Sequence, residues 1–596
     1  MAAAVVVERS VDCKSSVADL WRVLTDTSYL NRLTGEAPRQ IAEISASDGA
    51  RYRIKTKAGG FNVEWEEWPF EWEHQQRFRV FRKFKAGPVD TVDTALTFAA
   101  REDGGARVGI RLALVPKIAW LAWMVRFGTR RAADALVLSV RAVDEALSRR
   151  APLPLPSSAR PPEITGGLER AQRALREKAT SPELVDRLCD WIRMARDEDL
   201  ARIRPYALAD DWGVDRRTML ATCLQGVRAG LLELRWEVIC PSCRVGTEVV
   251  NTLSAVKEHA QCHLCEIAFG LEVDEALEAT FAPNTTVRKI DVGQYCVGGP
   301  ARTPHVLAQA LLPTRGHATI VAPEIGRYRL FVRGGEAIPL EVVAGGASTI
   351  TVRSDAREAQ HIAPGGTVTV ENAHADDRHV KLERVLHESQ AATAREVSLL
   401  PGFRRDFSSE VLRPDLALKI STVTLFFSDL TASTQLYADI GDAAALRLVH
   451  DHFDVVLGIV ERHGGALVKT IGDAVMAAFA DDLAAVSASI EMLRAFDKFR
   501  REVRNGERTH LKLGLFRGPS FLVTANGQLD YFGQTVNIAA RLQAQAASGE
   551  LVIEETLAEL AVQAGKLPAA SVKERYRATL KGVTEAIDVA RIVAAE

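Results

Sequence analysis

The first 150 residues alternate apolar and polar positions in a pattern that predicts a sheet closed by one long helix. Alternation recurs from Tyr52 to Leu114 and is broken by glycine-containing turns, as in an antiparallel meander. Between about Arg126 and Arg149 the apolar positions recur at helical spacing, which gives a stripe able to lie across a sheet. We therefore expect residues 1–150 to form one α+β domain.

This order of elements resembles the START-like (SRPBCC) superfamily, in which a helix-grip sheet wraps a long C-terminal helix over an apolar cavity. The likeness rests on the pattern and on the segment VADLWRVLTDTSYLNRLTG, residues 17–35. It implies a small apolar ligand or a regulatory docking surface; a structural module without a cavity is an equal alternative. The strand RFRVFRKFK, residues 77–85, interleaves basic and aromatic residues. Its alternation puts Phe78 and Val80 inside and the arginines in water, so we expect no nucleic-acid partner.

The middle of the chain divides by composition. A Pro/Ser-rich stretch predicts an extended linker, and the helical periodicity after it ends in a winged-helix-like pattern, for which a structural connector is the alternative to a DNA contact. Further on, short strands separated by glycines predict a small β-sandwich. The expected boundaries are a linker at 151–165, a helical module at 166–237, a four-cysteine segment at 238–275, a β-rich domain at 276–382, a second linker at 383–412 and a last domain at 413–596.

Four of the eight cysteines form two CxxC pairs. Cys240-Pro-Ser-Cys243 is followed, after eighteen residues, by Cys262-His-Leu-Cys265, a spacing typical of a tetrahedral four-cysteine zinc site. Because four protein ligands leave no open position for water, the expected Zn²⁺ is structural and the segment resembles a zinc ribbon. The remaining cysteines have no partner at useful spacing, and we expect them to be buried thiols.

Length and composition exclude several classes of protein. With 596 residues, 47% of them hydrophobic and 26% charged, the chain is expected to be multidomain and globular. The 75 Lys and Arg nearly cancel the 77 Asp and Glu, leaving a net charge of −2, so any site for a polyanion must be local. The apolar stretch Ile118–Val125 ends well short of the roughly 20 residues that cross a bilayer. We expect no membrane span, no secretory signal and a cytoplasmic location.

Two segments near the C-terminus place a carboxylate at the end of a predicted strand. The apolar run Val423–Phe427 predicts a buried strand that leads to Asp429 and a turn of small residues. The segment Gly465–Phe479 predicts two strands joined at a hairpin tip that carries Asp473. If the two carboxylates meet, they offer the hard oxygen ligands that Mg²⁺ prefers.

A third segment completes a recognisable set. In LDYFGQTVNIAARLQ, residues 529–543, the predicted helix makes Asn537 and Arg541 i,i+4 neighbours that reach the same point. Together with FFSDLTAST, residues 426–434, and VKTIGDAVMAAF, residues 468–479, it resembles the catalytic domain of class III nucleotidyl cyclases, the adenylate and guanylate cyclase family. The resemblance covers residues 413–596 and implies a ferredoxin-like α/β fold.

The resemblance also implies a role for each motif residue. Two Mg²⁺ (or Mn²⁺) ions would bind to carboxylates and a backbone carbonyl, while other residues would hold the base, the ribose and the phosphates. The implied set is Asp429, Asp473 and the Leu430 carbonyl for the metals, Lys469 and Asp530 for the base, Thr431, Ser433, Thr434 and Lys581 for the phosphates, Asn537 for the ribose and Arg541 for the charge that grows on the transferred phosphate.

The base-reading pair favours ATP. An ammonium that donates to ring N1 and a carboxylate that accepts from N6 suit adenine, whereas guanylate cyclases of this family usually carry Glu and a small polar residue instead. The implied reaction is attack of the ribose 3′-hydroxyl on the α-phosphorus, which forms 3′,5′-cyclic AMP and releases pyrophosphate. In this family each site takes residues from two protomers, so a homodimer is implied. The N-terminal modules would then regulate or localise the enzyme.

Three alternatives remain open at this point. GTP is the alternative substrate. A sensor that binds nucleotide or dimerises without turnover is the second, because Ala432 stands where many family members have Gly. The third is a START-like ligand carrier or zinc-ribbon DNA-binding module to which the cyclase is an accessory. Phe516 stands where relatives often have His, and we expect that change to alter packing rather than chemistry.

Overall fold

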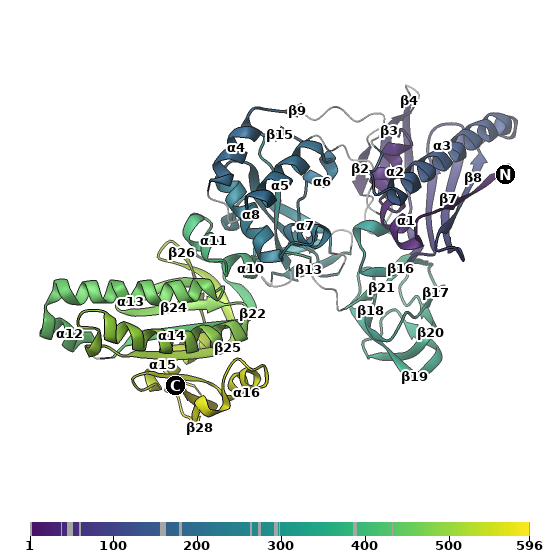
Figure 1. The fold of residues 1–596 in the computed structure, drawn as a ribbon. Helices are drawn as coiled ribbons and strands as arrows, with labels where there is room; N and C mark the ends of the chain where they lie inside the picture. Colours follow the sequence, from purple (N-terminus) through teal and green to yellow (C-terminus); the bar gives the residue numbers. More distant parts are fainter. Residues whose placement is uncertain are drawn as a thin grey trace.

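The structure is a computed structural model, drawn in Figure 1. It describes residues 3–36, 39–43, 52–58, 61–154, 163–177, 181–242, 244–262, 265–271, 276–290, 292, 296, 299–385, 390–431, 433–583 and 585–594. Most of the Pro/Ser-rich linker expected at 151–165 therefore lies outside the described residues, as do Cys243 and Ala432.

The N-terminal strands form the predicted antiparallel meander, in the order β1-β8-β7-β6-β5, with β4, β3 and β2 continuing from β6. The long helix α3 packs across β1 and β8 and buries Val140 and Val143. Phe78 and Val80 of β6 point inward, as the alternation predicts. The family likeness to START-like proteins stays a prediction. The bounds are β1 Val5–Cys13, α1 Val17–Leu24, α2 Thr27–Leu33, β2 Gln40–Glu43, β3 Tyr52–Ala58, β4 Phe61–Glu67, β5 Glu71–Glu73, β6 Arg77–Phe84, β7 Val89–Ala100, β8 Ala106–Pro116 and α3 Ala122–Ser148.

The helical module follows and ends on a small antiparallel sheet in the order β11-β10-β14. Strand β14 was expected in the β-rich domain at 276–382. It instead pairs with β10 along its whole length, and its residues are buried in the core of the helical module. The bounds are α4 Gly167–Arg176, α5 Pro182–Met194, α6 Asp197–Leu200, α7 Pro205–Trp212, α8 Arg216–Arg228, β10 Leu232–Ile239, β11 Gly246–Val250, β12 His259–Cys262, β13 Ile267–Gly270 and β14 Leu277–Pro283, with a short pair β9 Glu163–Ile164 and β15 Arg288–Lys289.

The β-rich segment is not a separate sandwich, contrary to the prediction. Strand β16 pairs with β5 at Ala308 and Gln309, and the indole N–H of Trp72 donates to the Val306 carbonyl at 3.1 Å. The described strands of this segment therefore belong to the same sheet as the N-terminal strands. They enclose a second apolar cluster that includes Leu330 and Val368. The bounds are β16 Val306–Leu312, β17 His317–Val321, β18 Gly326–Val332, β19 Ala337–Arg353, β20 Gln360–Glu371 and β21 Arg378–Arg384.

The linker expected at 383–412 is also corrected, because its second half is part of the core. Helix α10 (Ala394–Ser398) starts with a capping box between Thr393 and Glu396. Helix α11 (Pro401–Asp406) buries Phe403, whose ring meets that of Trp236 edge-on at a centroid distance of 6.1 Å. These two helices, which we call the connector together with the residues up to Leu412, join the helical module to the C-terminal domain.

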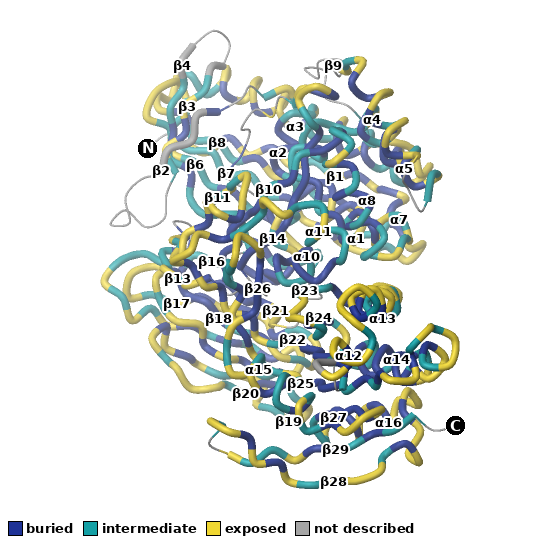
Figure 2. Tube along the Cα trace, turned by 90° about the vertical axis from the view of Figure 1, so that its left-hand side faces the viewer, coloured by how far each residue is buried: buried dark blue, intermediate teal, exposed yellow. Residues whose placement is uncertain are grey.

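The C-terminal domain is a mixed sheet in the order β23-β24-β22-β25-β27-β29-β28, with β26 beside β25. Helices α13, α14 and α16 cover one face, and α15, the connector and the helical module pack on the other. Figure 2 colours the buried residues of these elements dark blue. The bounds are β22 Leu418–Leu430, α12 Ser433–Ile440, α13 Asp442–Arg462, β23 Ala466–Ile471, β24 Ala474–Phe479, α14 Asp482–Glu502, β25 Leu511–Ala525, β26 Gln528–Phe532, α15 Gln534–Gln545, β27 Glu550–Glu554, α16 Glu555–Gln563, β28 Val572–Ala578 and β29 Ile587–Val593.

Among the helices in the described ranges, none combines the length and the apolar composition needed to cross a membrane.

Candidate active site

Two carboxylates meet at one end of the C-terminal sheet. Asp429 lies near the end of β22, and Asp473 lies in the two-residue turn between β23 and β24. Gly472 precedes it with a φ of +64°, which favours glycine in this tight turn. Because β22 and β24 are antiparallel and Ser428 pairs with Val475, the hairpin tip lies beside Asp429. The hairpin predicted around Asp473 is thus confirmed.

The pair is electrostatically strained and suits a divalent cation. One carboxylate oxygen of Asp473, Oδ2, is buried and has no hydrogen-bond partner among the described residues. Burial and then the charge of Asp473 raise the pKa of Asp429 above its ordinary value. Two hard, partly buried oxygen donors with a buried unpaired atom fit the ligand chemistry of Mg²⁺ or Mn²⁺.

Two residues to which no role was predicted also reach this pair. The Lys512 ammonium and the Gln543 amide nitrogen each lie 3.5 Å from Asp429 Oδ2. Lys512 sits directly opposite Asp429 in the β22–β25 register. The only signal for it is that register, which local sequence patterns do not supply. Its positive charge partly offsets the two carboxylates.

The predicted base-reading residues are in direct contact. The Lys469 ammonium of β23 lies 2.5 Å from Asp530 Oδ2 of β26. The other oxygen of Asp530 accepts a hydrogen bond from the Tyr531 backbone N–H at 2.8 Å. Asp530 is almost buried, whereas Lys469 is half-exposed. The pair therefore presents an ammonium donor and a fixed carboxylate side by side at the surface.

Asn537 and Arg541 both lie on α15, as predicted, one turn apart. The helix starts after Gly533, whose φ of +136° favours glycine. A Cβ placed on Gly582 would lie 3.6 Å from both terminal nitrogens of Arg541. The loop that carries Lys581 therefore lies against the Arg541 guanidinium, and the Lys581 side chain is exposed.

The turn after β22 is described only in part. The Thr431 backbone N–H donates to the His510 carbonyl, and its hydroxyl accepts from Ser548 at 3.3 Å. Leu430 buries its side chain in the core. Ser433 and Thr434 begin α12, but their side chains lie outside the described residues. Phe516 is half-buried and packs against the apolar side chains around it. Its effect on packing rather than chemistry stays a prediction.

The strands that carry the site are held by arginines from outside the domain. In each case the guanidinium donates to a backbone carbonyl of the cyclase region. The contacts are Arg217 of α8 to Gly464 just before β23 at 2.8 Å, Arg395 of α10 to Thr422 of β22 at 2.8 Å, and Arg404 of α11 to Leu529 of β26 at 2.7 Å.

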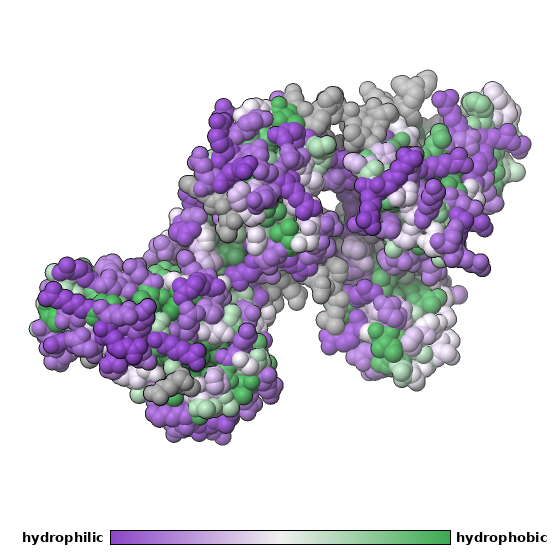
Figure 3. Space-filling model, viewed as in Figure 1, coloured by the Kyte–Doolittle hydropathy of each residue, from purple (hydrophilic) through white to green (hydrophobic). Residues whose placement is uncertain are grey.

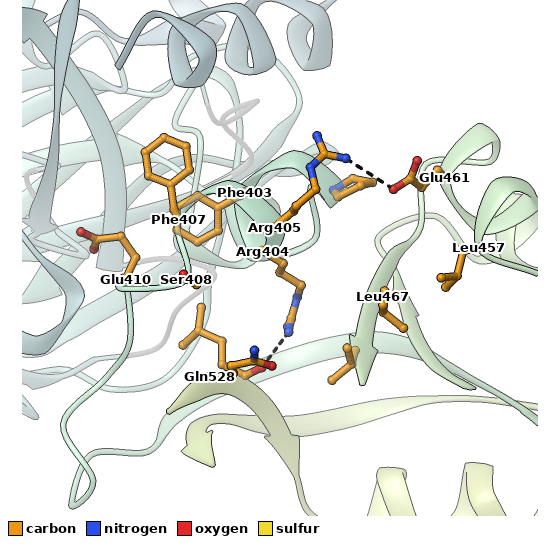
Figure 4. Close-up of a pocket in the computed structure, with 13 residues that line it drawn as sticks. Phe403, Arg404, Arg405, Phe407, Ser408, Glu410, Leu457, Glu461, Leu467 and Gln528 are labelled. Carbon is orange, nitrogen blue, oxygen red and sulfur yellow. Dashed lines mark hydrogen bonds and ion pairs between the residues drawn. The ribbon is translucent and has the colours of Figure 1, made fainter. Parts of the chain in front are cut away.

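A cavity of about 400 Å³ lies behind β23 and β26, the strands that carry Lys469 and Asp530, and is shown in Figure 4. Helix α11 forms one wall with Phe403 and Arg404, while Leu467 of β23 and Leu529 of β26 form part of the other. Arg404 reaches across it to β26, and its guanidinium stacks 5.1 Å from the ring centre of Tyr531. The connector therefore touches both neighbours of Asp530.

The cysteine segment brings three thiols together. The sulfur atoms of Cys240, Cys262 and Cys265 lie within 4.8 Å of one another and are buried. Cys243, the fourth predicted ligand, lies outside the described residues. The residue after each CxxC pair, Arg244 or Glu266, has a φ of +56°. The ammonium of Lys381 in β21 lies 3.6 Å from the Cys265 sulfur. The isolated cysteines Cys13, Cys189, Cys223 and Cys296 are buried, as expected.

Two family models match this chain. Residues 417–588 match the adenylate and guanylate cyclase catalytic domain. Residues 169–295, which include the helical module and the cysteine segment, match a family of unknown function, DUF5939.

Curated relatives match over a limited stretch. An uncharacterised protein of Mycobacterium tuberculosis is 34% identical over 141 residues, which are 23% of this chain and 34% of that protein. Guanylate cyclase 2G of Rattus norvegicus is 27% identical over 24% of this chain and 14% of its own length. The adenylate cyclase of Anabaena cylindrica is 29% identical over 20% of this chain and 26% of its own. This chain thus spans about a third or less of these relatives.

Among solved structures, the adenylyl cyclase CyaB from P. aeruginosa is 23% identical over 30% of this chain and 97% of that chain, with a TM-score of 0.27. The family match over 417–588 coincides with the sheet that carries the three motifs. Residues 417–588 are therefore a class III nucleotidyl cyclase catalytic domain, of the kind that adenylate and guanylate cyclases share.

Proposed function

We propose that this protein is an adenylate cyclase that converts ATP to 3′,5′-cyclic AMP and pyrophosphate. The observation that carries the choice of ATP is the contact between Lys469 and Asp530. Adenine offers an acceptor at N1 beside a donor at N6, and a neighbouring ammonium and carboxylate match that order. Guanine reverses it, placing a donor at N1 and an acceptor at O6.

The other predicted site residues would bind the metal ions, the ribose and the phosphates of ATP. Asp429, Asp473 and the Leu430 carbonyl would hold the divalent cations, which supply charge neutralisation at the reacting 3′-hydroxyl and the departing pyrophosphate. Asn537 would orient the ribose, and Arg541 would donate its guanidinium to the phosphate on which charge develops. Lys581, beside Arg541, would bind the terminal phosphates, and Thr431, Ser433 and Thr434 would face them at the turn. Positioning and charge then account for the catalysis.

We further infer a homodimer in which each site combines the metal carboxylates of one protomer with the base, ribose and phosphate residues of the other. Large apolar side chains support such an interface, because Ile471, Phe521 and Phe532 are 51%, 43% and 69% exposed beside the site strands. Phe521 and Phe532 are also register partners on β25 and β26. Covering them would remove apolar surface from water.

The three convergent thiols support a structural Zn²⁺ completed by Cys243. Glu266, which follows the second cysteine pair, forms ion pairs with Arg333 and Arg378 of the β-rich segment. The cysteine segment would therefore fix the helical module to the strands next to it.

Turnover is the first test of the proposed activity. Purified full-length protein with Mn²⁺ or Mg²⁺ is expected to form cyclic AMP from ATP and much less cyclic GMP from GTP. Asp473→Ala removes a metal ligand and is expected to lower kcat/KM by about 10²-fold or more. Lys469→Glu removes the donor to N1 and is expected to reduce the preference for ATP. Product analysis by chromatography measures all three.

The exposed Asp588→Asn serves as the control for this assay. Cyclic GMP as the main product would make the protein a guanylate cyclase. No product from either nucleotide, with saturable nucleotide binding retained, would instead favour the sensor without turnover.

The metal site is tested separately from activity by thermal unfolding. Asp473→Asn relieves the repulsion with Asp429 and is expected to raise the Tm in EDTA by a few degrees. The rise in Tm that Mn²⁺ produces in the unchanged protein is expected to shrink or vanish in this variant. An equal Mn²⁺-induced rise in both proteins would show that the cation binds elsewhere.

Mixing two inactive variants tests the shared site. Asp473→Ala and Arg541→Ala damage residues expected to come from different protomers. Equal mixing after subunit exchange is expected to restore about a quarter of the unmutated activity, since half of the dimers then contain one intact site. If the mixture stays as inactive as its components, each site is built within one chain.

Metal analysis tests the cysteine cluster. The full-length protein is expected to carry about one zinc per chain, and Cys262→Ser is expected to lose most of it. Cys223→Ser, which removes a buried thiol outside the cluster, provides the control. Zinc content that is unaffected by Cys262→Ser contradicts the assignment.

A further inference from the structure

The first turns of α3 and the 3-10 turn Ala119–Leu121 before it display a stripe of large apolar side chains that nothing in the described chain covers. Trp120, Trp123 and Phe127 are 69%, 70% and 67% exposed, and Ile118 and Met124 extend the stripe. Tryptophan and phenylalanine at this exposure are uncommon on a soluble surface unless they bind something. Apolar surface is visible at this end of the molecule in Figure 3.

The stripe is not the inward face of the helix. Val125, Thr129 and Ala133 are the buried positions of this part of α3, and they face the sheet. Positions 120, 123, 124 and 127 follow the spacing of one helical face, and that face lies on the opposite side from the buried one. The helix is therefore apolar on two sides, and only one of them is used by the fold.

Basic side chains surround the stripe. Lys117, Arg126, Arg130 and Arg131 are exposed, and none of them forms an ion pair with a described residue. From Lys117 to Ala133 the sequence contains no aspartate or glutamate. Since the whole chain has a net charge of only −2, this is a local concentration of positive charge.

We propose that this stripe is a peripheral membrane-binding surface, with Trp120, Trp123 and Phe127 at the headgroup level of an anionic bilayer. Indole and phenyl rings favour that depth, and the surrounding ammonium and guanidinium groups match anionic lipid headgroups. The helix lies in the plane of the surface and does not cross it, consistent with its length and composition.

Charge complementarity favours a bilayer over a second copy of the chain. Two copies meeting across a two-fold axis would place the same basic residues against each other. That arrangement brings like charges together around the apolar contact and is unfavourable. An anionic lipid surface instead neutralises all of them at once.

The position of α3 fits this role. Figure 1 places the N-terminal domain and the cyclase domain at opposite ends of the described chain. A surface on α3 therefore anchors the protein from the end away from the nucleotide site and leaves that site in water.

Co-sedimentation of the full-length protein with vesicles tests the proposal. Binding to vesicles of phosphatidylcholine with about 30% phosphatidylserine is expected to be strong at low salt and weak with phosphatidylcholine alone. Trp120→Ala with Trp123→Ala is expected to lower the partition coefficient about tenfold or more. Arg130→Gln with Arg131→Gln is expected to weaken binding to the anionic vesicles and flatten its salt dependence.

Ile325→Ala is the matched control, because Ile325 is a large apolar residue that is 62% exposed just before β18 and lies outside α3. It is expected to bind like the unmutated protein, and circular dichroism confirms that all variants are folded. No binding to anionic vesicles, or equal binding by the tryptophan variant, overturns the proposal. So does a tryptophan variant whose only change is a weaker self-association in the absence of vesicles, which would identify the stripe as a contact between copies.

Discussion

Burial of the open face of the cyclase sheet is the constraint on which the assembly of this chain depends. Helix α15 covers only part of the second face of this sheet, and without a further layer the apolar residues beside it, including Leu425 and Met476, would be exposed. Here the connector and the helical module supply the missing layer, and one apolar cluster runs from Trp236 through Phe403 to those strands. The cyclase domain therefore shares its core with the module that precedes it.

This shared core directly contacts the strands that carry the candidate site residues. Arg217, Arg395 and Arg404 each donate to a carbonyl of a strand, or of the turn before it, that carries a site residue. The contact from Arg404 is adjacent to Asp530, while Lys469 follows Leu467 in the opposite wall of the cavity behind the site. Displacement of the helical module would shift these strands as well, because backbone contacts and packed side chains move together. The fold thus offers a physical route from N-terminal modules to the active site.

Features that depend on the spacing of residues close together in the sequence could be predicted from it. Features that depend on which residues of two strands pair could not. Asp473 at a hairpin tip and the Asn537–Arg541 pair on one helix follow from spacing within a few residues. Lys512 opposite Asp429 follows only once β22 and β25 are aligned, since a shift by one position would place its side chain on the other face. The pairing of β5 with β16 likewise joins strands that lie far apart in the sequence, so local patterns do not predict it. The connector differs from the expected linker because Phe403, directly after Pro401 and Gly402, is buried against elements that lie far away in the sequence.

Two features of the candidate site are unfavourable in a single chain without ligands. The two carboxylates repel each other, and one of them, Asp473, has a buried oxygen without a hydrogen-bond partner among the described residues, which reduces stability. Exposed phenylalanines beside Lys469 and Asp530 add to that cost. The carboxylate pair becomes stabilising when it binds cations, and the exposed phenylalanines become stabilising when a second protomer covers them. Folding of one chain requires neither feature, and the proposed dimeric enzyme accounts for both. A domain retained only as a structural partner of the helical module would gain stability by losing them.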